Sequence, residues 1–283
     1  MHSVFLGQAL GPVLPRQREE KMIETGTYLH QMRATAPLVH NITNYVAMNI
    51  MANVLLSAGA SPAMVHAREE VAEFAGLAQT LTINIGTLDP AWAEAMEIAA
   101  RTMNAAGRPW VLDPVGVGAT RFRQEVCARL LLLRPTVIRG NASEILALSG
   151  LGGQGRGVDA ADPVAAAETA ARDLARRTGA VVAVSGPVDF VTDGASAYRV
   201  SNGHALMPCV TALGCSLNGV IAAFIAGQEP LGATVAALAY YGLAGERAAQ
   251  SAAGPGSFQT AFLDALHLLT PDDLRRGARV VAA

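Results

Sequence analysis

The sequence predicts an α/β fold in which helices cover both faces of a mainly parallel sheet, that is, a three-layer α/β/α domain. From about residue 31, helical segments alternate with short apolar runs bounded by turn residues, which is the pattern of successive βα units. No linker or shift in composition divides the 283 residues. We therefore expect an N-terminal arm at 1–30 and a single domain at 31–283.

The elements follow in order along the chain. The arm carries Gly, Pro and a charged run without a sustained hydrophobic period, and it should lead into a first helix. The predicted strands lie at 63–66, 81–85, 110–112, 136–139 and 180–184. The predicted helices between them lie at 46–57, 68–77, 90–106, 121–132, 143–148 and 163–178.

The periodicity changes after the last of these strands. Residues 190–192 and 197–200 should form a hairpin, because the intervening Asp193-Gly194 supplies the positive φ angles of a tight turn. The C-terminal third, from about residue 214, should be helical. Five of the eight residues at 150–157 are glycine, and we expect a mobile connection there because no strand directly precedes them.

Composition narrows the class of protein. Hydrophobic residues make up 51% of the chain and charged residues 16%, which favours a large core or burial against other subunits, so we expect an oligomer. The net charge of −2 gives no broad attraction to a phosphate backbone, and nucleic acid is not an expected partner. The chain also has a single lysine, Lys21, which counts against a Walker A loop, a protein kinase and a pyridoxal Schiff base.

Cysteine usage and hydropathy bear on location. Cys127, Cys209 and Cys215 have no disulfide or metal-ligand spacing, which fits a reducing compartment. The N-terminus has no basic region before its apolar patch, so no export signal is expected. The apolar stretch 205–245 is interrupted by proline and polar residues into pieces too short to span a bilayer. We expect a cytoplasmic protein without a membrane partner.

The first segment that indicates chemistry is 113–120, Asp-Pro-Val-Gly-Val-Gly-Ala-Thr, which follows a buried strand and opens a helix. This places Asp113 at the carboxyl end of the sheet, where open α/β folds bind ligands, in a position that suits a metal or a phosphate. A capping aspartate in a strand-ending turn is the open alternative. The dinucleotide fingerprint is not met, since Arg121 occupies its sixth position.

The second segment, one βα unit later, brings together Arg139, Asn141 and Glu144. Neighbouring parallel strands should place these groups beside Asp113. Two carboxylates and an amide suit Mg²⁺, and Arg139 could hold a phosphate in its planar fork. The alternative is a helix start in which Asn141 is the cap and Glu144 closes a capping box, and both interpretations can hold together.

The third segment, 210–219, is a turn of small residues that enters an apolar helix. Free amide groups and the helix dipole at such a start stabilise the charge of a transferring phosphoryl group. Cys215 lies in the first turn, where we expect a thiol pKa below its usual value and a weak proton acceptor. A small core residue is the alternative.

Taken in this order, the three segments resemble the ribokinase-like superfamily. The N-terminal half narrows the resemblance to the hydroxyethylthiazole kinase family, because residues 39–46, 59–64 and 83–88 carry Val-His-Asn-Ile-Thr-Asn-Tyr-Val, Gly-Ala-Ser-Pro-Ala-Met and Ile-Asn-Ile-Gly-Thr-Leu. The likeness covers residues 37–228. It implies a ribokinase-like fold, transfer of phosphate from ATP to the thiazole alcohol of thiamine salvage, a Mg²⁺ ion, and a homotrimer with active sites between subunits.

The resemblance also implies roles for individual residues. Those expected to act around Mg²⁺ are Asp113 and Glu144. Those expected at ATP are Arg139, Ser185 and Asn141. Those expected to line the acceptor pocket are Asn44, Met64, Gly86 and Ala212. Those expected at the transferring phosphate are Cys215, in the position of the aspartate base of the sugar kinases, and Gly214, in the anion hole.

Some features depart from the family or leave other functions open. Ala212 and Leu213 occupy a turn where relatives often have glycine or a small polar residue. His40 is expected to be a core residue without a direct role. The alternative functions are a hydroxymethylpyrimidine kinase, an NAD(P)H-hydrate dehydratase and a nucleotide sensor without catalysis. The N-terminal motifs favour the thiazole kinase over the first two, and Asp113, Glu144 and Arg139 argue against the sensor.

Overall fold

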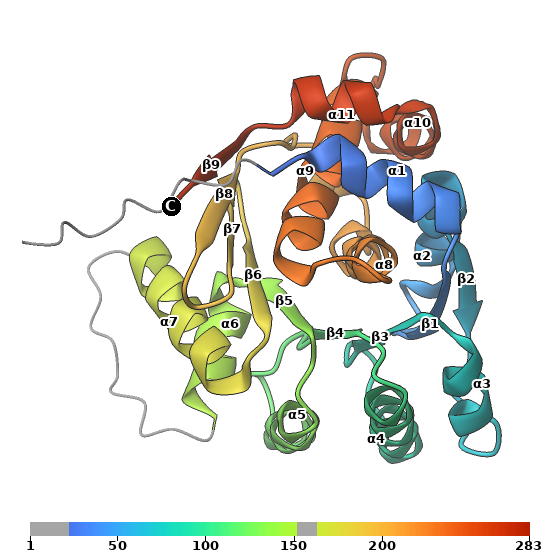
Figure 1. Ribbon diagram of the computed structural model, residues 1–283, viewed down its shortest axis with the longest axis vertical. Helices are drawn as coiled ribbons and strands as arrows, with labels where there is room; N and C mark the ends of the chain where they lie inside the picture. Colours follow the sequence, from blue (N-terminus) through green and yellow to red (C-terminus); the bar gives the residue numbers. More distant parts are fainter. Residues whose placement is uncertain (1–22, 152–162) are drawn as a thin grey trace, which may run out of the picture.

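The computed structural model describes residues 23–151 and 163–283, which form one sheet between two layers of helices (Figure 1). The strands are β1 (Leu38–Ile42), β2 (Ser61–Met64), β3 (Thr80–Asn84), β4 (Trp110–Asp113), β5 (Val137–Asn141), β6 (Val181–Ser185), β7 (Asp189–Thr192), β8 (Ala197–Val200) and β9 (Val280–Ala282). The helices are α1 (Thr25–Thr35), α2 (Met48–Ala58), α3 (Val71–Leu77), α4 (Pro90–Ala105), α5 (Arg121–Leu132), α6 (Ala142–Gly150), α7 (Pro163–Thr178), the 3-10 turn η1 (Met207–Cys209), α8 (Leu213–Ile225), α9 (Pro230–Ala249), α10 (Pro255–Leu268) and α11 (Pro271–Gly277).

The sheet runs in the order β2-β1-β3-β4-β5-β6-β7-β8-β9. Pairing is parallel from β2 to β6 and antiparallel from β6 to β9. Helices α1, α2 and α8 to α11 cover one face and are called the first layer, and α3 to α7 cover the other face (Figure 1). The predicted three-layer fold with a mainly parallel sheet is therefore confirmed, as is the predicted hairpin, which is β7 and β8.

Each face of the sheet contributes to its own hydrophobic core. Side chains of a strand alternate between the faces, so Val111 joins the core under α8 and α9 while the next residue, Leu112, joins the core over α4 and α5. Strands β4 and β6 are buried on both sides, which explains why they appear in the sequence as nearly continuous apolar runs.

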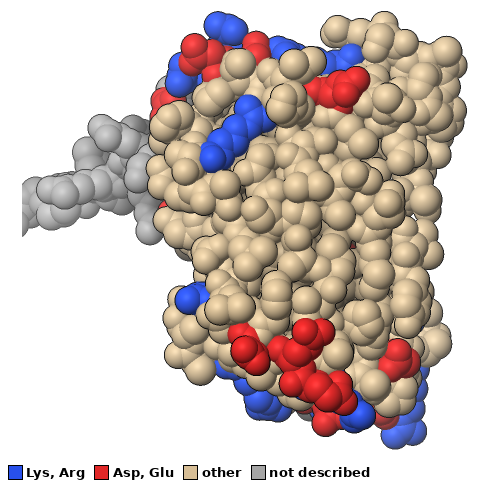
Figure 2. All heavy atoms as spheres, turned by 90° about the vertical axis from the view of Figure 1, so that its right-hand side faces the viewer, with Lys and Arg blue, Asp and Glu red and all other residues tan. Residues whose placement is uncertain are grey.

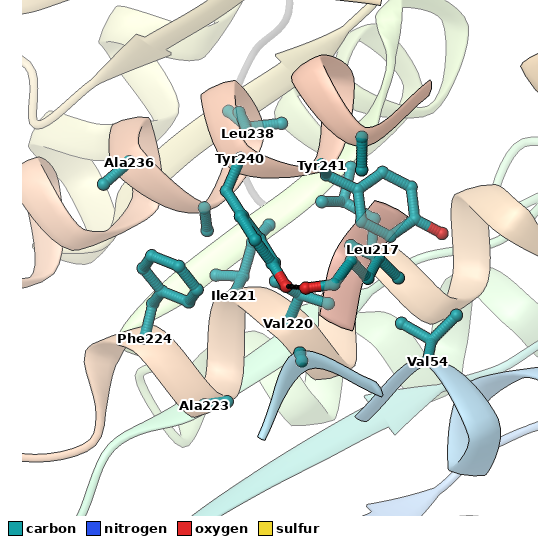
Figure 3. Packing of buried hydrophobic residues seen from close by; sticks show 14 of the residues in the cluster. Val54, Leu217, Val220, Ile221, Ala223, Phe224, Ala236, Leu238, Tyr240 and Tyr241 are labelled. Atoms are coloured by element: carbon teal, nitrogen blue, oxygen red, sulfur yellow. Dashed lines mark hydrogen bonds between the residues drawn. The ribbon is translucent and has the colours of Figure 1, made fainter. Parts of the chain in front are cut away.

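Helices α8 and α9 form the buried centre of the first layer. Nearly all of α8 is buried, and Leu217, Val220 and Phe224 pack against α9, with Val54 of α2 beside them (Figure 3). This burial accounts for the long uncharged stretch in the sequence. In the two ranges that the structure describes, no helix is long and apolar enough to cross a bilayer.

Three expectations about elements were wrong. β1 was not predicted, because His40 and Asn41 interrupt its apolar run; their side chains bond backbone carbonyls of the neighbouring strand segment. β2 ends at Met64, two residues before the predicted end, since its pairing with β1 stops there. β9 interrupts the predicted helical C-terminal third, because three residues are too few to show a strand period.

The predicted division at residue 30 falls inside α1, which begins at Thr25 and buries Leu29. Residues 1–22 of the predicted arm lie outside the described part of the chain. The glycine-rich segment at 150–157 also lies largely outside it, from residue 152 onward.

Arg33 of α1 joins three helices of the first layer. Its guanidinium donates to Ala58 O at the end of α2 (3.1 Å), to Leu266 O of α10 (2.7 Å) and to Leu269 O just after α10 (2.7 Å). These carbonyls lack partners within their own helices, and a cation at a helix C-terminus is also favoured by the dipole. The Arg33 contacts therefore cap two helices with one side chain.

Candidate functional site

The carboxyl ends of β3, β4 and β5 meet the first turn of α8 at one place. Asp113 ends β4 and is bonded both to Asn84, which ends β3, and to Asn218 of α8. Arg139 of β5 donates to Gly214 O in α8 (3.0 Å). The topology thus gathers side chains from distant parts of the chain at the edge where parallel α/β sheets bind ligands.

Asp113 is buried, with 1% of its surface exposed. Its Oδ2 accepts from the amides of Asn84 and Asn218, both at 2.6 Å. Its Oδ1 is buried and has no partner in the described residues. Burial raises the pKa of this carboxyl to about 7, although the positive charge of Arg139 opposes the rise. One oxygen is therefore fixed by amides while the other stays available to a ligand.

Asn84 and Asn218 are the functional candidates that the sequence reasoning missed. Besides bonding Asp113, Asn84 accepts at Oδ1 from the amide of Asn44 (2.8 Å) and from Gly86 N–H (2.9 Å). A buried chain of hydrogen bonds thus runs from Asn44 through Asn84 to Asp113. A signal was present for Asn84, because an amide side chain stood near the end of a predicted strand, where parallel sheets bind ligands. Asn218, inside an apolar helix, was marked only by its spacing of four residues from Gly214.

The structure brings together three residues that were expected at the acceptor pocket or at the transferring phosphate: Asn44, Gly86 and Cys215. The Asn44 amide contacts Cys215 Sγ at 3.4 Å. A Cβ added to Gly86 would lie 2.8 Å from the Asn44 side chain, so only glycine fits there without a shift. These three residues form one wall beside the start of α8.

The expectation of a lowered thiol pKa at Cys215 was wrong. Burial raises the pKa of Cys215, and the negative charge of Asp113 raises it further, while hydrogen bonds from Asn44 and Asn84 act in the opposite direction. Loss of solvation therefore outweighs the helix N-terminus. The thiol stays protonated at neutral pH, so less thiolate is available to accept a proton than the sequence suggested.

Glu144 and Asn141 form the capping box that was the alternative interpretation of their spacing. Asn141 Oδ1 accepts from Glu144 N–H (3.0 Å), and Glu144 Oε2 accepts from Asn141 N–H (2.9 Å). Glu144 Oε1 also accepts from Gly116 N–H (3.0 Å), which ties the loop after β4 to the start of α6. This bond holds Glu144 at the loop that follows Asp113, and the charge of Glu144 raises the pKa of Asp113.

A cleft with a volume of about 800 Å³ opens on the other side of the α8 start. The predicted nucleotide residues Arg139 and Ser185 line it, and Arg139 Nη2 donates to Ser185 Oγ (2.7 Å). Arg139 Nε is buried and has no partner in the described residues. A guanidinium at the inner end of a cleft is well suited to bind phosphate oxygens.

The other two predicted pocket residues lie at the end of β2 and directly before α8. Met64 is the last residue of the edge strand β2; it is half-buried and packs against the core under α8 and α9. Ala212 lines the cleft and precedes α8 with φ of +60°, a left-handed conformation that glycine adopts more easily. The departure from glycine noted in the sequence thus falls on a strained residue.

The donor set at Asp113 and Glu144 fits a magnesium ion. No cluster of three or more His, Cys, Asp or Glu side chains with metal-binding geometry is found in residues 23–151 and 163–283. Mg²⁺ is usually held by one or two carboxylates, with water and substrate phosphates completing its ligands, so such a cluster is not required. The unpartnered Oδ1 of Asp113 and the neighbouring Glu144 carboxylate meet this requirement.

Comparison with known proteins finds hydroxyethylthiazole kinases among the relatives of this chain. A hydroxyethylthiazole kinase of Cereibacter sphaeroides is 68% identical over 262 residues, which cover 93% of this chain and 100% of that protein. A hydroxyethylthiazole kinase of Rhizobium leguminosarum bv. trifolii is 60% identical over 260 residues, 91% of this chain and 97% of that protein.

Solved structures agree as well. The hydroxyethylthiazole kinase protein of Pyrococcus horikoshii OT3 superimposes with a TM-score of 0.87 at 42% identity, over 93% of this chain and 100% of that one. A pyridoxal kinase of Staphylococcus aureus shares the fold, with a TM-score of 0.63 at 17% identity over 88% of this chain and 98% of that one. The model of the Hydroxyethylthiazole kinase family matches residues 29–272, so the chain belongs to that family.

Proposed function

We propose that this chain transfers the γ-phosphate of ATP to the primary hydroxyl of 4-methyl-5-(2-hydroxyethyl)thiazole, with Mg²⁺ held by Asp113 and Glu144. The observation that carries the proposal is the position of the α8 start between two sets of groups. Arg139 and the cleft lie on one side of it, and Asn44 and Cys215 lie on the other. Donor phosphate and acceptor alcohol can therefore meet at the same helix end.

The start of α8 supplies donors for the transferring phosphate. Ser216 N–H bonds Ala212 O, so the N–H groups before it in the first turn have no acceptor within the helix. Together with the dipole they favour negative charge at this position. Arg139 faces the same position through its bond to Gly214 O. Bound Mg²⁺ would offset further charge on the phosphates.

On the acceptor side, the amide chain holds the reacting groups in place. Asn44 is fixed by Asn84 and by its own contact with Ala47 N–H (2.9 Å), so its side chain cannot rotate freely. Cys215 contributes mainly by its position beside the acceptor, and it is not indispensable as a base, since phosphoryl transfer depends mainly on position and charge. The proposed reaction needs ATP, which is available in the cytoplasm, the location predicted from the sequence.

The experiment measures ADP release by the purified chain with Mg²⁺ and ATP in three reactions. We expect release with hydroxyethylthiazole, little with hydroxymethylpyrimidine and none without an acceptor. Release only with the pyrimidine would assign the chain to the alternative kinase, and ATP binding without ADP release would make it a sensor. Arg139→Lys should raise the KM for ATP about 10-fold, whereas Arg101→Lys, an exposed residue paired with Glu97, should not.

We also propose that the chain works as a homotrimer. The side of the molecule with α2 and β2 has a broad area without charged side chains, bordered by charges above and below (Figure 2). Tyr45 is 63% exposed next to Asn44, and Leu56 of α2 is 61% exposed. β2 is an edge strand whose outer side is open to a partner. A neighbouring subunit placed here would cover apolar surface beside the acceptor pocket.

Sedimentation equilibrium tests the trimer. We expect a mass three times 29.3 kDa at micromolar concentration, and a single species of 29.3 kDa would contradict the proposal. Leu56→Glu should shift the mass towards the monomer. Leu132→Glu changes a leucine that is 82% exposed on α5, away from this side, and should leave the mass unchanged.

A further inference from the structure

Arg123 directs its guanidinium at backbone carbonyls of two loops that carry the site. Nη1 donates to Ile85 O and to Val115 O, and Nη2 donates to Gly86 O, all at 2.6 Å. Arg123 takes part in none of the ion pairs found in residues 23–151 and 163–283. The hydrogen bonds of its guanidinium therefore all go to main-chain oxygens.

The two loops belong to different halves of the proposed reaction. Gly86, in the loop after β3, donates to Asn84 and lies so near Asn44 that an added Cβ would be 2.8 Å from that side chain, so it belongs to the acceptor side. Val115, in the loop after β4, lies between Asp113 and Gly116, whose N–H bonds Glu144. The loop after β4 therefore belongs to the metal side. Arg123 is a direct link between the two sides that does not pass through Asp113.

We propose that Arg123 is a positioning residue for phosphoryl transfer, which sets the distance between the acceptor loop at 85–86 and the metal loop at 113–116. The proposal rests on the proposed function. Carbonyl oxygens repel one another, so three of them converge only around a donor that reaches all three. The planar fork of arginine does this with fixed geometry, whereas an ammonium group is compact and cannot span the same oxygens.

The chemical consequence follows from the sensitivity of transfer reactions to distance. A displacement of about 1 Å between reacting groups can lower the rate about 100-fold. Loss of the fork would let the two loops separate while the sheet stays paired, because Arg123 is not part of any strand. We therefore expect Arg123 variants to lose turnover and acceptor affinity at temperatures where they remain folded.

The test compares Arg123→Met and Arg123→Lys with Arg129→Met. Arg129 lies on the same helix, but its side chain is 47% exposed and pairs with Glu97. Turnover of both Arg123 variants should fall about 10- to 100-fold, measured well below each variant's Tm, with a raised KM for the acceptor. The Arg129 variant should match the wild type. If Arg123→Met does not fold, the turnover and acceptor KM of Arg123→Lys alone test the proposal.

Two results would overturn the proposal. A lower Tm with unchanged turnover and KM would leave Arg123 a purely structural role. Full activity in Arg123→Lys would show that charge suffices and that the fork has no part in positioning. Affinity for the thiazole alcohol, measured by calorimetry, gives a readout without turnover and should weaken about 10-fold in Arg123→Lys.

The wild-type reactions separate this proposal from the proposed function. If the wild type phosphorylates a different acceptor, the proposed function fails, and the Arg123 variants are compared on that acceptor instead. Equal activity of wild type and variants on it would reject the positioning role by itself.

Discussion

The helical layer around Arg33 and the carboxyl edge of the sheet both bury polar groups, yet only the first provides each of them with a partner. Arg33 meets carbonyls of α2 and α10, and Tyr240 Oη donates to Leu266 O beside it. The buried polar atoms without partners in the described residues are His40 Nδ1, Thr43 Oγ1, Asp113 Oδ1, Arg139 Nε and Asn218 Oδ1. All but the first lie at the carboxyl edge.

The difference teaches where stability and where function reside. Unpartnered buried groups cost free energy, and they persist where a ligand completes them. Substitutions at the carboxyl edge should therefore lower activity and spare stability, whereas substitutions at Arg33 should do the reverse.

Asp113→Asn should have the largest effect. The asparagine can still accept from Asn84 and Asn218, but it lacks the charge needed to hold Mg²⁺ at the phosphates. We expect turnover to fall at least about 1000-fold with an intact fold, as seen by circular dichroism and steady-state kinetics. Turnover near the wild-type rate at saturating Mg²⁺ would remove Asp113 from the site.

The same variant should gain stability, which sharpens the contrast. The pKa of Asp113 is raised to about 7 in the folded state, so between pH 4 and 7 the folded state binds more protons than the unfolded state. The contribution of Asp113 to stability therefore decreases as pH rises through this window. In Mg²⁺-free buffer at pH 8, Asp113→Asn should melt at a higher temperature than the wild type, and at pH 4 the two should converge.

Arg33→Met should show the opposite behaviour. It removes the donor for the carbonyls at the ends of α2 and α10, and we expect a loss of about 3 kcal/mol in the free energy of unfolding. Urea denaturation measures this loss. The values of kcat and KM at 25 °C should stay within about twofold of the wild type. A large drop in kcat, measured on protein that is still folded, would mean that the two regions are coupled.

Cys215→Ala should have a moderate effect. Because burial raises the pKa of the thiol, it is not ionised at neutral pH, and we expect kcat to fall about 10-fold. The pH profiles of kcat for wild type and variant should run parallel between pH 6.5 and 8.5. A rise with pH that appears only in the wild type would indicate that the thiolate acts as base.

Ala212 should give the smallest effect. Its φ of +60° costs alanine about 1 kcal/mol, and Ala212→Gly removes this strain but adds backbone freedom to the unfolded chain. We expect a net change within about 0.5 kcal/mol. Ala212→Val, with a branched Cβ, should destabilise by more than 1 kcal/mol in the same urea assay. Equal stabilities for all three would argue against strain at this turn.

Much of the fold was predictable because buried parallel strands and amphipathic helices have distinct periods. β4 and α5 were found from such patterns nearly to the residue. β1 was not, since His40 and Asn41 look like loop residues until their partners across the sheet are known. β9 depends on pairing with β8, about eighty residues earlier in the chain, which no local window contains.

The site was predictable where motifs mark it and not where burial decides. Asp113, Arg139 and Glu144 were selected from their places at strand ends. In the structure Arg139 and Asp113 both bond α8, and Glu144 bonds the loop after Asp113. The thiol pKa at Cys215 was mispredicted, because sequence reveals a helix start but not the depth at which it lies. Arg123 escaped notice, since hydrogen bonds to carbonyls leave no mark in the sequence, whereas the position of Asn84 at a strand end was a signal that was not used.

The late position of α8 and α9 in the chain has a consequence for biosynthesis. β5 ends at Asn141, whereas α8 and α9, which complete the cover of this side that α1 and α2 begin, start only at Leu213. At about 5–20 residues per second, a ribosome needs on the order of ten seconds to make the intervening residues. Throughout that interval the nascent strands expose an apolar face that their own chain cannot yet cover completely, which makes the unfinished polypeptide the form most open to aggregation and to capture by chaperones.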